Sequence, residues 1–196
     1  RDLHSFPTRR SSDLENAARS TAEAIESFEN IKSVLILCGS GNNGGDGFAL
    51  ARQICGLYSV RVLFLGDYSK LSAESRINYQ FAKNCGIDIH QIDPDESLEL
   101  LDFETDCIVD ALIGVGGSEA LRGKVVDLLA IANKTDAVKI AVDVPTGMNA
   151  TSGVTHQNCF RADATVTMLS LKSGFLYKAN QKFLGEIFIA DLAIPI

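Results

Sequence analysis

Residues 35–54, LILCGSGNNGGDGFALARQI, decide the fold of this chain. An apolar run ends in a loop at positions 39–47 that holds five glycines, two asparagines and one aspartate, and an amphipathic run follows. This order predicts a buried strand, a tight loop and the start of a helix. Glycine permits positive φ and lets a ligand approach the backbone, and a helix N-terminus offers free N–H groups with a partial positive charge. We therefore expect a ligand to bind at this loop.

Outside this stretch, segments with helical periodicity alternate with short apolar runs typical of buried strands. Helices are predicted at 15–28, 44–57, 72–85, 95–101 and 124–132, and strands at 34–38, 60–65, 88–92, 107–111, 137–142, 164–169 and 186–190. The helix at 72–85 is expected to turn Ile77, Phe81 and Cys85 inward. Such alternation implies βαβ units with right-handed crossovers and helices on both faces of the sheet. We predict one three-layer αβα domain, Rossmann-like and mostly parallel, over residues 15–196.

The first fourteen residues, RDLHSFPTRRSSDL, differ from the rest of the chain. They lack an apolar run of the kind found in a secretory signal. They resemble translated adapter sequence that contaminates some short-read assemblies, and a genuine disordered terminus is the alternative. We expect residues 1–14 to be non-native or disordered.

Composition excludes several classes of protein. The 196 residues are 46% hydrophobic and 22% charged, as in ordinary globular domains, and no run approaches the roughly 18 apolar residues of a membrane span. The formal net charge of −7 comes without a basic stripe, which disfavours nucleic acid as a partner. The odd number of cysteines, without a CxxC pair, indicates reduced thiols and a cytoplasmic location.

Three predicted strands end in loops of unusual chemistry, at 39–47, 110–117 and 143–147. Open parallel sheets bind their ligands outside the carboxyl ends of the strands. Because these three ends belong to one sheet, the loops are expected to converge on a single site.

The first loop matches a dinucleotide fingerprint at Gly39, Gly41 and Gly44, and Asp67 follows where a ribose-binding acid would sit. An NAD-dependent dehydrogenase is therefore one hypothesis. Asp46 counts against it, because a carboxylate in the first helical turn would repel the pyrophosphate. The alternative for Asp46 is an acid that complements the helix dipole.

A bound cation would relieve this repulsion. Asn42, Asn43 and Asp110 supply the oxygen ligands that hard cations prefer. The asparagines are alternatively residues of a turn and a helix cap. Asp110 ends an apolar strand, where an uncompensated charge is costly, so it is expected to have a partner; its alternative role is a loop cap.

Asp143 and Lys172 are the candidate catalytic residues. Asp143 ends a strand and Pro145 stiffens the loop that follows, which suits a general acid or base. Lys172 follows the strand at 164–169 and could neutralise phosphate or acids in the site. A structural turn acid and a solvated lysine are the respective alternatives.

The loop at 39–47, GSGNNGGDG, resembles the signature of the YjeF N-terminal domain family, the NAD(P)H-hydrate epimerases. Further segments resemble that family in the same order, at 15–18, 109–114, 121–123, 143–147, 162–167 and 172–174. The resemblance implies an isomerase for cofactor repair. Its substrates would be NADH and NADPH hydrated at C6 of the nicotinamide ring (NADHX and NADPHX), whose R and S forms it interconverts for an S-specific dehydratase.

The resemblance also implies a site. One K⁺ per subunit would be held by Asn43, Asp110 and Thr146, and Asp143 would contact the substrate. The remaining substrate contacts would come from the first two loops: Asn42, Asn43, Gly44, Gly45, Asp46, Gly114, Val115, Gly116, Gly117, Ser118, Glu119 and Ala120. Thr146 stands where the family usually has serine, and 116–119 is more glycine-rich and acidic than the family pattern.

Partners follow from the resemblance as well. The expected assembly is a homodimer, and the functional partner is an ADP- or ATP-dependent dehydratase, which in many bacteria follows the epimerase domain in one chain. A non-catalytic YjeF-like module that binds a nucleotide or a protein is the second hypothesis. Such modules tend to lose the acids, whereas Asp46, Asp110 and Asp143 are all present.

Overall fold

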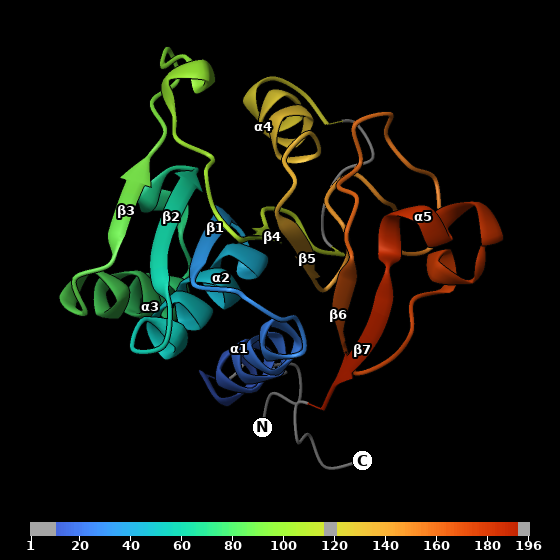
Figure 1. The fold of residues 1–196 in the computed structure, drawn as a ribbon, viewed down its shortest axis with the longest axis horizontal. Helices are drawn as coiled ribbons and strands as arrows, with labels where there is room; N and C mark the ends of the chain where they lie inside the picture. The colour runs from blue at the N-terminus through green and yellow to red at the C-terminus, as the bar shows by residue number, and fades with distance from the viewer. Residues whose placement is uncertain (1–10, 116–120, 192–196) are drawn as a thin grey trace, which may run out of the picture.

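A computed structural model describes residues 11–115 and 121–191. Its centre is one sheet of seven parallel strands in the order β3-β2-β1-β4-β5-β6-β7. The strands are β1 (Ser33–Gly39), β2 (Ser59–Leu65), β3 (Asp88–Gln91), β4 (Cys107–Ala111), β5 (Val138–Val142), β6 (Ala164–Met168) and β7 (Glu186–Ala190). The order runs outward from β1 in both directions, as in doubly wound folds. The predicted three-layer, mostly parallel architecture is confirmed (Figure 1).

Helices cover both faces of the sheet (Figure 1). The α-helices are α1 (Ser11–Glu26), α2 (Asn42–Ile54), α3 (Ala73–Asn84), α4 (Lys124–Ala132) and α5 (Gln181–Leu184), and the 3₁₀ helices are η1 (Tyr68–Lys70), η2 (Leu98–Leu100), η3 (Ser173–Leu176) and η4 (Lys178–Asn180). None of the helices within the described ranges is long and apolar enough to cross a membrane.

Alternate residues of β1 pack into two separate hydrophobic cores, because successive side chains of a strand point to opposite faces of the sheet. Val34, Ile36 and Cys38 pack with α1, α2 and α3. Leu35 and Leu37 pack with α4 on the other face. Burial on both faces explains why this strand is a continuous apolar run in the sequence.

Several boundaries differ from the sequence prediction. The first helix begins at Ser11 rather than at residue 15, and Leu14 is buried in the core. The helix therefore starts before the domain boundary that we expected after residue 14. Residues 1–10 lie outside the described part. The predicted helix at 95–101 is wrong: the only helical turn there is η2, Leu98–Leu100.

The predicted inward face of α3 is also wrong. Ile77 and Phe81 are about half exposed, Cys85 is exposed, and the buried face instead carries Ser75, Asn78, Tyr79 and Ala82. A Cβ on Gly45 of α2 would lie 2.4 Å from Ser75 Oγ, so the two helices approach closely through small residues. The face of α3 that packs on α2 therefore includes the small polar residue Ser75 as well as Tyr79, whose ring contacts Phe48.

Candidate functional site

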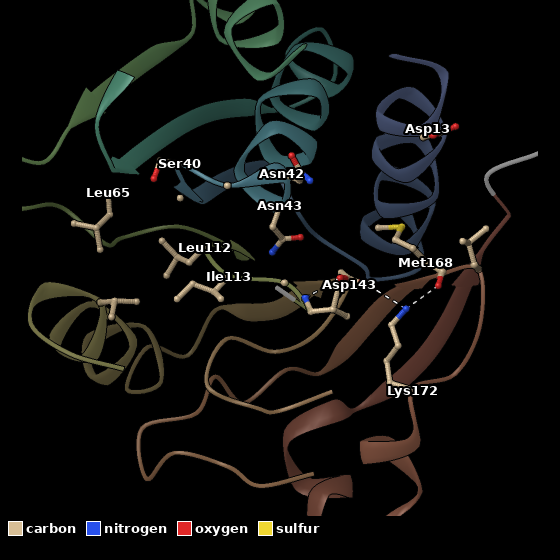
Figure 2. A pocket seen from close by; sticks show the side chains of 16 residues that line it. Asp13, Ser40, Asn42, Asn43, Leu65, Leu112, Ile113, Asp143, Met168 and Lys172 are labelled. Carbon is tan, nitrogen blue, oxygen red and sulfur yellow. Dashed lines mark hydrogen bonds and ion pairs between the residues drawn. The ribbon is translucent and has the colours of Figure 1, made fainter. Parts of the chain in front are cut away.

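A cavity of about 740 Å³ opens at the carboxyl ends of β1, β4, β5 and β6. Its wall is largely apolar, with a few polar side chains from distant parts of the sequence (Figure 2). The polar side chains are Asp13, Ser40, Asn42, Asn43, Asp143 and Lys172. The expected convergence of the three loops is therefore present, since Asn43, Gly114 and Asp143 each come from a different one.

Glycines let the first loop fold tightly against the ends of β1 and β4. A Cβ on Gly44 would lie 1.8 Å from the carbonyl oxygen of Gly39, and a Cβ on Gly39 would lie 2.1 Å from that of Leu112. Both distances are far inside van der Waals contact with backbone atoms that cannot swing away. Gly41 is the N-cap of α2, and no side chain caps the helix there, which leaves the first-turn N–H groups available to a ligand.

We expect Gly44→Ala to lower the free energy of unfolding by about 2 kcal/mol, because the added methyl forces the backbone apart. Gly41→Ala is the matched control, since nothing lies within 4 Å of a Cβ at that position. Urea denaturation of both variants measures the difference. Equal losses for the two variants would contradict the steric argument.

Asp143 sits in a strained turn directly after β5. Its φ is 68°, its N–H donates to Val166 O at 2.7 Å, and the next N–H, of Val144, donates back to Val142 O at 2.9 Å. This i→i+2 bond around a residue of positive φ is a γ-turn. The turn holds the Asp143 carboxylate at the cavity with only 6% of the residue exposed.

The carboxylate of Asp143 is held from two sides. Val115 N–H donates to Oδ2 at 3.1 Å, and Lys172 Nζ lies 3.4 Å from Oδ1. Lys172 also donates to Met168 O at 2.9 Å. The structure therefore brings the two candidate catalytic residues together as an ion pair on the cavity wall (Figure 2).

Asp110 is fully buried beside the cavity and organises the loop that contains Thr146. Its Oδ2 accepts Thr146 N–H at 2.7 Å, and its Oδ1 accepts Thr146 Oγ1–H at 2.7 Å and Leu112 N–H at 3.1 Å. Thr146 Oγ1 in turn accepts Ile113 N–H at 3.0 Å. Burial raises the pKa of Asp110 to about 6, against the opposing effect of these hydrogen bonds.

The Asn43 amide is the unsatisfied group of the site. Only 6% of the residue is exposed, and neither its Oδ1 nor its Nδ2 has a hydrogen-bond partner among the described residues. Buried polar groups are normally paired. A Cβ on Gly114 would lie 3.4 Å from Asn43 Oδ1, so this amide faces Gly114. The residue before Gly114, Ile113, donates its N–H to Thr146 Oγ1. Asn43, Asp110 and Thr146 thus offer oxygen atoms of the kind that a hard cation takes.

The other predicted contact residues are placed as follows. Asn42, Gly114 and Val115 line the cavity. Gly44, Gly45 and Asp46 are buried in α2 and are absent from that lining. Because α2 begins at Asn42, no acid lies in its first turn, so the expected position of Asp46 in that turn is wrong. The predictions for Gly116, Gly117, Ser118, Glu119 and Ala120 fall outside the described residues.

Asp67 has a different role from the ribose-binding acid that the fingerprint predicts. Its Oδ1 accepts the N–H and the Oγ–H of Ser69, at 2.9 and 2.7 Å, and so caps η1. These hydrogen bonds lower its pKa. Asp67 is exposed and is absent from the cavity lining.

Sequence reasoning missed five residues that line the cavity outside the predicted loops: Asp13, Leu65, Val125, Met168 and Leu169. Asp13 lies in the segment that we expected to be outside the fold. Leu169 follows the last residue of β6, and its only sequence signal is its position at a strand end three residues before Lys172.

Comparisons with known proteins agree on one family. The model of the YjeF-related protein N-terminus matches residues 13–174. The "NAD(P)H-hydrate epimerase" of Rhodopirellula baltica is 39% identical, over 93% of this chain and 75% of its own, and the protein of the same name from Oenococcus oeni is 38% identical, over 84% and 76%.

Two further relatives extend the comparison. The "Bifunctional NAD(P)H-hydrate repair enzyme" of Pyrobaculum aerophilum is 35% identical over 93% of this chain, which spans 37% of that longer protein. A crystal structure of a yeast protein superposes with a TM-score of 0.75 at 24% identity, covering 88% of this chain and 76% of its own. That likeness shows the shared fold.

Proposed function

The chain belongs to the family of the YjeF-related protein N-terminus, and from this premise we propose that it is an NAD(P)H-hydrate epimerase. It interconverts the R and S forms of NADHX and NADPHX at C6 of the nicotinamide ring. The names of its relatives support this activity. The observation that carries the mechanism is the Asp143–Lys172 ion pair on the wall of the cavity.

Asp143 is the acid/base of the reaction. C6 of the hydrated ring bears a hydroxyl and the ring nitrogen, so it is a hemiaminal carbon. Loss of the hydroxyl as water, or opening of the C6–N bond to an aldehyde, makes this carbon planar, and re-addition from the other face inverts it. Each route delivers one proton and removes one, with no change of oxidation state. A carboxylate aimed at the ring can do both.

Lys172 orients the carboxylate of Asp143. Its ammonium lies 3.4 Å from Oδ1, while Val115 N–H fixes Oδ2. The substrate's phosphates meet the uncapped N-terminus of α2, where Asn42 and Asn43 line the cavity. We assign the further substrate contacts to the second glycine-rich loop, Gly114 to Ala120, because Gly44, Gly45 and Asp46 are buried in α2 outside the cavity lining.

We also propose that K⁺ binds to Asn43, Asp110 and Thr146. The support is chemical: a buried amide without a partner, a buried carboxylate and a threonine hydroxyl form a set of oxygen donors. When bound, the cation would satisfy Asn43 Oδ1 and offset the negative charge of Asp110 and of the substrate phosphates.

The ion is expected to raise the melting temperature by about 5 °C in saturating KCl compared with choline chloride at equal ionic strength, because it binds only the folded state. Differential scanning fluorimetry measures this shift without substrate. Thr146→Ser keeps the hydroxyl and should keep the shift, whereas Thr146→Val should lose it. The same melting temperature in K⁺, Na⁺ and choline would remove the ion from the proposal.

A coupled assay tests the activity. A mixture of R and S hydrated NADH is supplied with an S-specific dehydratase, and recovery of NADH is followed by absorbance. Recovery should stop at the S fraction without this protein and go to completion with it. Recovery that stops at the S fraction in both cases would refute the epimerase assignment.

The dehydratase is the functional partner. Bifunctional relatives carry a matching segment within a longer chain, which supports cooperation of the two activities, either in one chain or in two. We further propose a homodimer that works in the cytoplasm, to be checked by sedimentation and by cell fractionation.

A further inference from the structure

We propose that Leu169 positions the substrate by packing its side chain against the hydrated nicotinamide ring beside Asp143. This inference rests on the epimerase function proposed above. Leu169 lines the same cavity as Asp143, and it follows β6 as Asp143 follows the neighbouring strand β5.

Leu169 occupies the same kind of turn as Asp143. Its φ is 64°, its N–H donates to Ala190 O at 3.1 Å, and Ser170 N–H donates back to Met168 O at 2.7 Å. Each of the two residues thus donates the last backbone hydrogen bond from its strand to the neighbouring strand and is then the central residue of a γ-turn. The adjacent strands β5 and β6 therefore both end in a γ-turn that places a side chain at the cavity, the carboxylate of Asp143 and the isobutyl group of Leu169.

The backbone of Leu169 adopts a conformation that is unfavourable for leucine. Positive φ occurs at three non-glycine residues in the described part of the chain, Asn30, Asp143 and Leu169. Asparagine and aspartate tolerate this region, whereas leucine rarely adopts it. Strain of this kind persists where the surrounding structure enforces it, and it clusters at functional sites. The γ-turn at Leu169 is therefore explained by the side chain that it places at the cavity.

The position of Leu169 suits a ring that extends from Asp143. Val142 pairs with Val166 in the sheet, so Asp143 continues opposite Thr167, and Leu169 lies two residues, or roughly 7 Å, further out along the strands. If C6 of the hydrated nicotinamide ring lies at Asp143, the ring can extend along this distance toward Leu169.

Leu169 offers an exposed apolar side chain that the ring can cover. The Leu169 residue is 57% exposed at the cavity. Its neighbour Met168 accepts the hydrogen bond from Lys172 that aims the lysine at Asp143. The apolar contact and the ion pair are thus built on the same short segment, so a ring resting on Leu169 is held in register with the acid/base.

Leu169→Ala and Leu169→Gly test the inference. Both are expected to raise KM for the hydrated cofactor about tenfold, as loss of most of an apolar side-chain contact predicts, with kcat within threefold of wild type. Leu169→Gly should melt no lower than Leu169→Ala, because glycine adopts positive φ without strain. Leu171→Ala is the control, since Leu171 is 49% exposed in the same loop and lies outside the cavity lining; its KM should equal that of wild type.

Two results would overturn the inference: an unchanged KM in Leu169→Ala, or a rise in KM that Leu171→Ala shares. Binding of intact NADPH, followed by its fluorescence, separates this failure from failure of the proposed function. A wild-type protein that does not epimerise, but binds NADPH more tightly than Leu169→Ala does, would refute the epimerase assignment and keep Leu169 as a ring contact. Active protein with equal NADPH affinity and KM in wild type and Leu169→Ala would refute the role of Leu169 alone.

Discussion

Asp143→Asn is expected to lower kcat for epimerisation by about a thousandfold, the scale of a lost general acid or base. The amide cannot exchange the proton that inversion at C6 requires. The fold should survive, because asparagine also tolerates the positive φ found here and its side-chain oxygen can still accept the N–H of Val115. The coupled assay measures kcat, and the melting temperature verifies folding.

Asp67→Asn is the matched control for this variant. Asp67 also accepts hydrogen bonds in a loop after a strand, but it is exposed and outside the cavity lining, so its kcat should stay at the wild-type value. A folded Asp143→Asn protein with near-normal kcat would show that another group moves the proton.

Asp110→Ala is expected to lower the free energy of unfolding by about 3 kcal/mol in K⁺-free buffer, because three donors lose their acceptor in a site that water does not reach. These donors are the N–H groups of Leu112 and Thr146 and the hydroxyl of Thr146. Since they hold the second and third loops together, the variant should also lose the K⁺-dependent rise in melting temperature. Urea denaturation measures the loss.

Asp106→Ala provides the comparison, because Asp106 also accepts three hydrogen bonds, from Lys32 N–H, Ser33 N–H and Ser33 Oγ–H. Asp106 is exposed, so water can replace its carboxylate and the loss should be much smaller. Similar losses of unfolding free energy in the two variants would mean that burial does not explain the loss in Asp110→Ala.

The local pattern of residues 35–54 was sufficient to predict β1 and α2, because an apolar run and a helical period act over a few residues. The loop expected at 39–47 is shorter than predicted: only Ser40 and Gly41 lie between the two elements, and α2 begins at Asn42 rather than at residue 44. The rule that parallel sheets bind at their carboxyl ends then predicted that Asn43, Gly114 and Asp143 would share one site, and they line one cavity. The short segment at 95–101 was predicted incorrectly, because acids near its start resemble a first helical turn although only Leu98–Leu100 is helical.

By itself, the sequence determined the alternation of strands and helices and the edge of the sheet where the cavity opens, since both follow from local periodicity and from topology. Only the tertiary structure decided which face of α3 is buried, that Lys172 reaches Asp143, and that Leu169 turns toward the cavity. These features depend on close helix contacts at Gly45 and on the register of β5, β6 and β7. Such contacts join residues far apart in the chain, and no local pattern records them.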